Sequence, residues 1–147
     1  MPERAATCLD PVTTGMAWSV LGEVQQLLEN LAEQGAVAVI DLRSLPLTRA
    51  DRAQLEALLG RGEVRAELAV GGRSIVWETA YPGAWWIRHF GTDDQVLSEQ
   101  IAICPVPELF PAHVVDIRAG ASRLKHLLAN ELAGRSAGNP TEDRSNG

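Results

Sequence analysis

The side chains best suited to covalent chemistry in this 147-residue chain are Glu78, His89 and Cys104. Gathered near one sheet edge, they could act as base, orienting group and nucleophile, respectively. Nothing in their spacing requires them to meet, and the sequence has no Gly-rich phosphate loop, G-x-S-x-G elbow or HExxH motif. We therefore expect no catalytic residues and no enzymatic activity.

A metal site would use cysteines and histidines at particular spacings. Cys8 and Cys104 are the two cysteines, and neither belongs to a CxxC pair. The three histidines, His89, His113 and His126, form no i, i+4 pair on a helix. We expect no metal site and no cofactor, with Cys104 as a small core residue at a strand end. One alternative stays open: an iron or iron–sulfur precursor handled by Cys104, Cys8 and a histidine.

Residues 71–90 hold three of the four Trp, the single Tyr and one of the two Phe. Trp85 and Trp86 are consecutive, and neighbouring side chains of a strand point to opposite faces, so a one-sided core accepts one of them. We predict that the other indole is an exposed anchor for a protein partner. The predicted partner-binding residues are Glu78, Tyr81, Trp85, Trp86 and Arg88. The alternative is that both indoles are buried, under helices on two sheet faces.

The composition is that of an ordinary soluble globular protein, with 46% hydrophobic and 22% charged residues. The net charge of −6, without a stripe of Lys and Arg, argues against nucleic acid as a partner. No apolar run approaches the roughly 20 residues that a membrane span requires, and the N-terminus lacks the apolar stretch of a signal peptide. We therefore expect a cytoplasmic protein.

Hydrophobic spacing and capping residues predict three helices and one buried strand. The first helix covers residues 16–34 and ends at Gly35, and the run 37–42 is a short buried strand. A second helix begins with a capping-box-like pair, Thr48 and Asp51, and ends at Gly60. The final helix has an apolar stripe, ends at Gly134 and should pack across the sheet.

Two hairpins complete the predicted elements. Gly71-Gly72 is a two-residue turn, which places residue 70 opposite 73 and pairs Arg65 with Glu78 across the strands. The second hairpin joins residues 84–90 and 96–104. Its register stays open, and with it which of the two adjacent indoles faces outward.

These elements predict an α+β fold: a two-layer sandwich with a mostly antiparallel sheet of about five strands and three helices. The helices cover one face of the sheet, and the other face is open. We expect a flexible N-terminal arm over residues 1–15, a single domain over 16–134 and a disordered tail over 135–147.

Three segments, taken together, are typical of one protein family. They are Ile40-Asp-Leu-Arg-Ser-Leu-Pro-Leu-Thr48, Leu58-Leu-Gly-Arg-Gly-Glu-Val64 and Glu78-Thr-Ala-Tyr-Pro-Gly-Ala-Trp-Trp86. They resemble the C-terminal region of the HupH/HyaF family of hydrogenase expression proteins, over about residues 20–130. The resemblance brings no catalytic residues with it.

The resemblance implies a chaperone-like accessory protein in [NiFe]-hydrogenase maturation. Such a protein would hold the iron–sulfur small subunit before assembly and work beside other hydrogenase accessory proteins. A homodimer is a further expectation, since an open sheet face could close on a second copy. A self-associating structural protein is therefore the remaining alternative.

Overall fold

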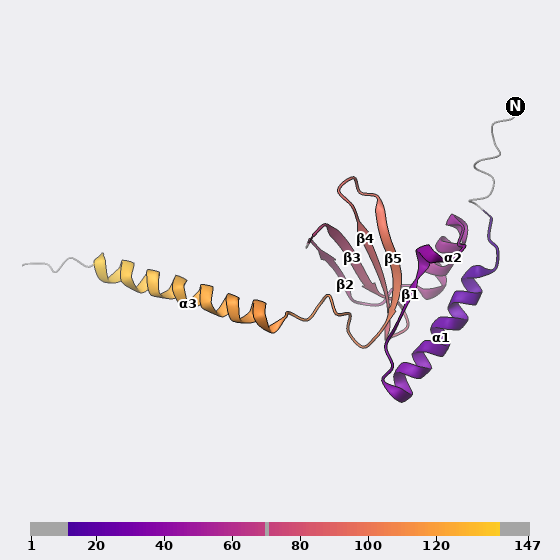
Figure 1. Cartoon of the computed structure of the whole chain (residues 1–147), viewed down its shortest axis with the longest axis horizontal. Coiled ribbons are helices and arrows are strands. Elements are labelled where there is room, and N and C mark those ends of the chain that lie inside the picture. Colours follow the sequence, from indigo (N-terminus) through magenta and orange to yellow (C-terminus); the bar gives the residue numbers. More distant parts are fainter. Residues whose placement is uncertain (1–11, 70, 139–147) are drawn as a thin grey trace, which may run out of the picture. The chain divides into compact units, whose positions relative to one another are not determined.

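The computed structural model describes residues 12–69 and 71–138. The chain divides into two compact units, residues 1–107 and 108–147, whose positions relative to one another are not determined (Figure 1). The first unit holds a sheet and two helices, and the second holds the last helix. The single domain expected over residues 16–134 stays a prediction.

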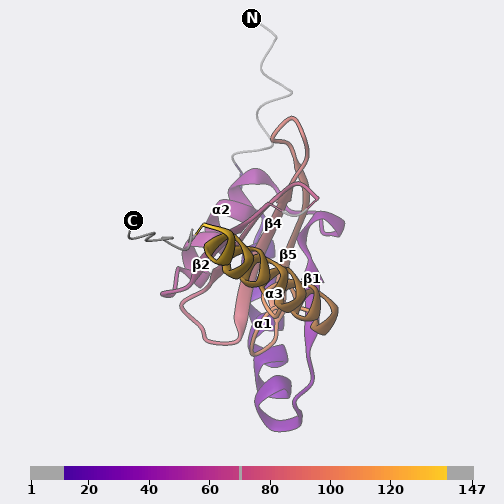
Figure 2. The same ribbon diagram turned by 90° about the vertical axis from the view of Figure 1, so that its left-hand side faces the viewer.

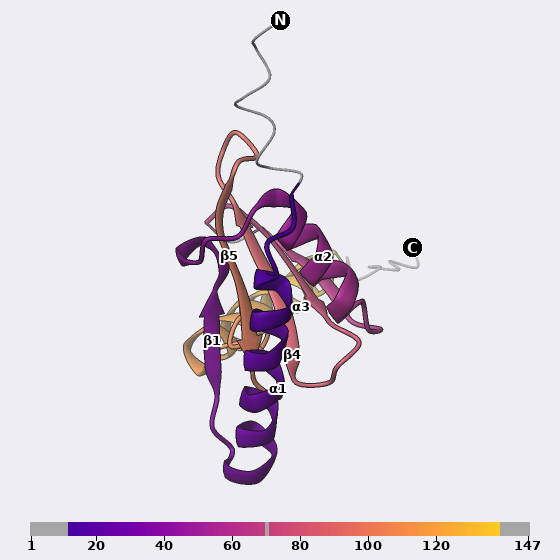
Figure 3. The ribbon, with the colours of Figure 1, turned by 90° about the vertical axis from the view of Figure 1, so that its right-hand side faces the viewer.

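Within the described residues, five strands form one antiparallel sheet in the order β1-β5-β4-β3-β2. The strands are β1 (Ala38–Asp41), β2 (Arg65–Leu68), β3 (Arg73–Glu78), β4 (Ala84–Phe90) and β5 (Val96–Ile103). Two helices, α1 (Met16–Gln34) and α2 (Arg49–Leu59), lie on the same side of this sheet. Figure 3 shows them in front of the strands, and Figure 2 views the sheet from the opposite side. The α+β fold is confirmed.

The two helices of the first unit follow from local signals. Both have the predicted bounds. Gly35 ends α1 with a φ of 67°, and its N–H donates to the Leu31 carbonyl at 2.9 Å. The capping box of α2 is present: Thr48 Oγ1 accepts from the Asp51 N–H, and the Asp51 carboxylate accepts from the Thr48 N–H.

Residues 12–15 differ from the flexible arm expected over residues 1–15. Thr14 donates two hydrogen bonds to the Asp51 carboxylate, from its N–H at 2.7 Å and from its hydroxyl at 2.6 Å. Thr48 Oγ1 donates to the Val12 carbonyl at 2.7 Å. This segment is therefore tied to the start of α2, while residues 1–11 lie outside the described residues.

The last helix, α3 (Val114–Ala137), runs past the predicted end. Gly134 does not end it, because a glycine costs a helix only about 1 kcal/mol relative to Ala, and the Gly138 N–H still donates to the Gly134 carbonyl. Residues 135–137 of the expected tail are thus helical, and residues 139–147 lie outside the described residues. The packing of this helix across the sheet stays a prediction. No described helix is long and apolar enough to cross a membrane.

The first hairpin is one residue out of the predicted register. Arg65 lies opposite Trp77, and Leu68 lies opposite Ser74, so the connection is longer than a two-residue turn. Arg65 and Glu78 are therefore not a cross-strand pair. A Gly-Gly pair permits positive φ angles, which both glycines have, but it does not fix the length of the loop around them.

The strand expected over residues 37–42 is an edge strand rather than a fully buried one. Ile40 is buried, but Val39 on the opposite face is 59% exposed. Leu42 is buried in the short 3-10 turn that follows (Leu42–Ser44). Residues 37–42 therefore contribute to the core through Ile40 in the strand and Leu42 in the turn, and not through every residue of the apolar run.

Candidate functional site

Trp85 and Trp86 point to opposite faces of β4, as expected, but both indoles are buried. Trp86 is fully buried beneath the helices and stacks on Trp77, with ring centroids 5.6 Å apart and planes 8° from parallel. Trp85 is 4% exposed on the other face, and its Nε1 donates to the Cys104 carbonyl at 3.1 Å. The prediction that one indole is an exposed anchor is wrong.

The reason is that the second face of the sheet also buries apolar side chains. The cross-strand pairs Val76 with Ile87, and Trp85 with Ala102, place these four residues on that face, and all four are buried. The expectation of an exposed indole holds only for a sheet with a core on one side. Here both faces bury apolar side chains, so Trp85 and Trp86 are both buried.

Arg88 belongs to a buried charge network rather than to an exposed surface. Its Nε donates to the Glu99 carboxylate at 2.5 Å, and Nη2 lies 3.4 Å from Glu56 on α2. The Trp86 Nε1 donates to the same Glu99 carboxylate at 3.2 Å. Arg52 Nε lies 3.6 Å from Glu99, an ion pair that is too long for a hydrogen bond. Because Glu99 is 3% exposed, the network fixes α2 against β4 and β5 from inside.

The candidate catalytic residues do not meet. Glu78 lies opposite Trp85, four residues along β4 from His89, which corresponds to about 13 Å in a strand. His89 Nδ1 is instead 2.5 Å from the hydroxyl of its cross-strand partner, Ser74. Within the described residues, no three His, Cys, Asp or Glu side chains gather as metal ligands. Cys8, the other cysteine of the proposed iron site, lies outside those residues.

Tyr81 is the predicted site residue that is well exposed, at 48%. It lies in the β3–β4 turn, where Thr79 Oγ1 exchanges hydrogen bonds with its N–H and carbonyl, both at 3.2 Å. Ala80 N–H donates to the Leu59 carbonyl at the end of α2. Gly83 has a φ of 93°, and a Cβ there would lie 3.2 Å from methyl groups of Leu28 and Leu31. The turn is therefore fixed against α1.

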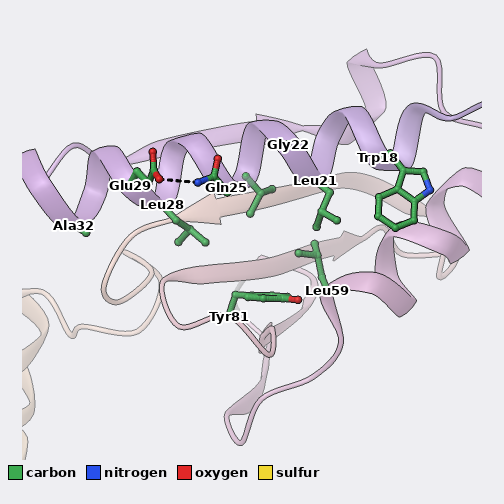
Figure 4. A pocket seen from close by; sticks show the side chains of 10 residues that line it. Trp18, Leu21, Gly22, Gln25, Leu28, Glu29, Ala32, Leu59 and Tyr81 are labelled. Carbon is green, nitrogen blue, oxygen red and sulfur yellow. Dashed lines mark hydrogen bonds between the residues drawn. The ribbon is translucent and has the colours of Figure 1, made fainter.

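This turn forms one wall of an apolar groove along α1, with a volume of about 670 Å³ (Figure 4). Its lining includes Trp18, Leu21, Gln25, Leu28, Leu59 and Tyr81. Trp18 is 57% exposed, and Figure 4 shows its ring at one end of the groove, with Leu59 and Tyr81 opposite α1. An exposed concave apolar surface with two aromatic side chains is suited to binding a protein segment.

Sequence reasoning missed Trp18. The signal was present, because Trp18 does not belong to the stripe of Val20, Val24 and Leu31 that faces the core. A large apolar side chain outside the core stripe of an amphipathic helix indicates an exposed contact surface. The predicted residue Glu78 is half-buried at the end of β3, next to the same turn.

Comparison with known proteins identifies the family. Residues 15–130 match the model of the HupH hydrogenase expression protein, C-terminal conserved region. The chain belongs to this family. The chain is 27% identical to the hydrogenase expression/formation protein HupH of Rhodobacter capsulatus, over 85% of this chain and 46% of that protein. It is 33% identical to the hydrogenase-1 operon protein HyaF of Escherichia coli K12, over 60% of this chain and 31% of that protein.

A solved structure shares the fold. The hydrogenase expression protein HupH from Thiobacillus denitrificans matches with a TM-score of 0.78 and 38% identity, over 81% of this chain and 99% of that one. The chain spans less than half the length of the two curated relatives above. The resemblance expected from residues 40–48, 58–64 and 78–86 is thus confirmed.

Proposed function

We propose that this chain is a chaperone-like accessory protein of [NiFe]-hydrogenase maturation, which binds the immature iron–sulfur small subunit in the cytoplasm before assembly. Its family membership supports the general role, since its relatives are named as hydrogenase expression or formation proteins. Other hydrogenase accessory proteins are further proposed partners. A binding role without catalysis agrees with the separation of Glu78 from His89.

The groove along α1 is the observation that carries this proposal. Trp18 and Tyr81 are about half exposed at its rim, and aromatic side chains of this kind dominate binding energies at protein interfaces. Leu21, Leu28 and Leu59 between them offer an apolar floor. We place the client contact here, so Tyr81 keeps its predicted role and Trp18 joins it.

The remaining predicted site residues would act indirectly. Trp86 and Arg88 hold α2 against the sheet, and Trp85 fixes the start of the segment after β5. Glu78 lies beside the groove's turn, where its carbonyl accepts the Gly62 N–H at 2.7 Å. These residues would keep the groove in shape rather than touch the client.

The test is a pull-down of the small-subunit precursor by Trp18→Ala and Tyr81→Ala variants. We expect each to weaken binding by at least about tenfold, with the melting temperature nearly unchanged because both side chains are exposed. Val39→Ala is the matched control, since Val39 is 59% exposed on the other face of the sheet. Precursor binding equal to that of the control for both variants would refute the placement in the groove.

A further inference from the structure

The side chains that α1 contributes to the groove follow a heptad repeat. Five of them, which we call the groove seam, are separated alternately by three and four residues: Trp18, Leu21, Gln25, Leu28 and Ala32. The residues that face the core keep the same spacing one position earlier, at Ala17, Val20, Val24, Leu27 and Leu31. Helix α1 therefore has two neighbouring seams, one in the core and one in the groove. Such spacing is typical of a helix that packs along another helix, because the seam then stays on one side over several turns.

The walls of the groove offer few free backbone groups to an occupant. The backbone of α1 is bonded within the helix, and in the β3–β4 turn the N–H groups of Thr79, Ala80 and Tyr81 already donate within the protein at 2.9–3.2 Å. Pro82 has no N–H. An extended segment on this surface would bury its own N–H and C=O groups without partners, which is unfavourable. A helix satisfies its own backbone, so these walls favour a helical occupant.

Gly22 is the smallest residue of the lining, beside Leu21 in the middle of α1. Glycine weakens the interior of a helix. A Cβ at this position would meet no atom within 4 Å, so packing within the described residues does not explain the glycine. A second helix that crosses here would explain it, because a residue without a side chain lets two helix backbones approach closely.

The charge of α1 indicates the chemistry of the occupant. This helix has three Glu and neither Lys nor Arg. Glu29 lines the groove, where its carboxylate accepts a hydrogen bond from Gln25 Nε2 at 2.8 Å (Figure 4). Charges that flank a heptad seam determine the choice of partner. The α1 helix of a second copy has no cation to pair with Glu29, whereas a helix with Lys or Arg on its flank does.

We propose that the α1 groove binds an amphipathic helix of the client, with apolar side chains at heptad spacing and Lys or Arg on the flank that faces Glu29. The groove extends from Trp18 to Ala32, about 21 Å along α1, which corresponds to about four turns of the bound helix. The inference rests on the proposed function and deepens it, because it names the class of client segment that the groove takes. Gly22 is then the point of closest approach.

The first experiment measures the binding of three labelled peptides to the purified full chain by fluorescence anisotropy. Each peptide has about 21 residues, enough to form a helix. The Lys peptide has Leu at the seam positions, Ala elsewhere and Lys on both flanks, where like charges also keep it from pairing with itself. The Glu peptide has Glu in place of Lys, and the Pro peptide is the Lys peptide with one central Pro that breaks the helix.

We expect the Lys peptide to bind at least about tenfold more tightly than either of the other two. Equal affinities for all three peptides, or no binding of the Lys peptide, would overturn the proposal.

The second experiment changes the groove. Gly22→Gln should lower the affinity for the Lys peptide at least about tenfold, because it fills the point of closest approach. Its melting temperature should stay level or rise, since Gln is the better helix former. Ser19→Gln is the matched control, because Ser19 is exposed and belongs to neither seam, and it should bind like the original chain. Unchanged affinity in Gly22→Gln would refute the crossing at this glycine and with it the proposal.

The charge is tested at Glu29. Glu29→Lys should weaken binding of the Lys peptide and strengthen binding of the Glu peptide, each by about threefold. A change in the same direction for both peptides would contradict the pairing of Glu29 with a cation of the occupant.

The pull-down of the small-subunit precursor separates this inference from the proposed function. If Trp18→Ala weakens precursor binding while Gly22→Gln does not and the Lys peptide fails to bind, the proposed function stands and the helical occupant is refuted. If the Lys peptide binds as expected and the precursor does not, the helix site stands and the proposed client is wrong. A dimer that Trp18→Glu dissociates in sedimentation equilibrium would assign the groove to a second copy and overturn the proposal. Peptide binding that appears only with Leu124→Glu and Leu128→Glu in α3 would overturn it too, in favour of the chain's own last helix.

Discussion

Glu99 is the buried charge on which the packing of α2 against the sheet most depends. Its carboxylate accepts the buried Trp86 N–H at 3.2 Å and an Arg88 N–H at 2.5 Å, and only 3% of its side chain is exposed. Glu99→Ala removes the oxygen that accepts both hydrogen bonds and leaves the indole N–H without a partner. We expect this single change to destabilise the first unit more than the loss of any exposed charge.

The magnitude follows from the two bonds. An unpartnered buried donor costs about 1–3 kcal/mol, and a hydrogen bond to a charged group contributes about 1.5–3 kcal/mol. The Arg88 contribution lies at the lower end, because Arg88 is 24% exposed and keeps Glu56 at 3.4 Å. The sum is a loss of about 3 kcal/mol in the free energy of unfolding. For a unit of this size, the melting temperature should fall by roughly 15 °C.

The assay is urea unfolding followed by tryptophan fluorescence, because Trp77 and Trp86 stack within this core. Glu99→Gln keeps an acceptor for the indole and should cost about half as much. Glu56→Ala is the control: its side chain is 30% exposed, so its ion pairs should contribute less than about 1 kcal/mol. If Glu99→Ala costs no more than Glu56→Ala, the network does not stabilise the fold as argued.

Three further predictions concern local stability. Thr14 is the main cause that lowers the pKa of Asp51 from 3.8 to about 2, through the hydrogen bond of its hydroxyl, while burial opposes the shift. The folded state thus favours the carboxylate, so its stabilisation is complete above about pH 4 and is lost as the pH falls toward 2. Urea unfolding at several pH values should show a weaker decline over this range for Asp51→Asn. Gly22→Ala should stabilise α1 by about 0.5–1 kcal/mol, since its Cβ meets nothing within 4 Å. Gly62→Ala should destabilise the fold by about 1–3 kcal/mol, because its Cβ would lie 2.7 Å from the Thr79 carbonyl oxygen. Thermal unfolding measures both glycine variants, and melting temperatures equal to that of the original chain would contradict both predictions.

The binding role of the predicted site residues stays a prediction. The break between strands at Tyr81 is confirmed, because Tyr-Pro-Gly is typical of a turn, and the turn leaves Tyr81 exposed. The groove could not be predicted, since it forms where α1, the end of α2 and this turn meet across more than 60 residues of sequence. Trp18 is the part of the lining that the sequence did indicate, because it lies outside the core-facing stripe of α1.

The sequence by itself determined the helices of the first unit and the family. The Thr48 and Asp51 cap and the Gly35 end are signals within a few residues, and they act in the same way wherever the helix packs. Only the tertiary structure decided the hairpin register and the burial of Trp85. A shift of one residue moves every side chain to the other face, and the cost of that shift lies in packing against distant strands and helices.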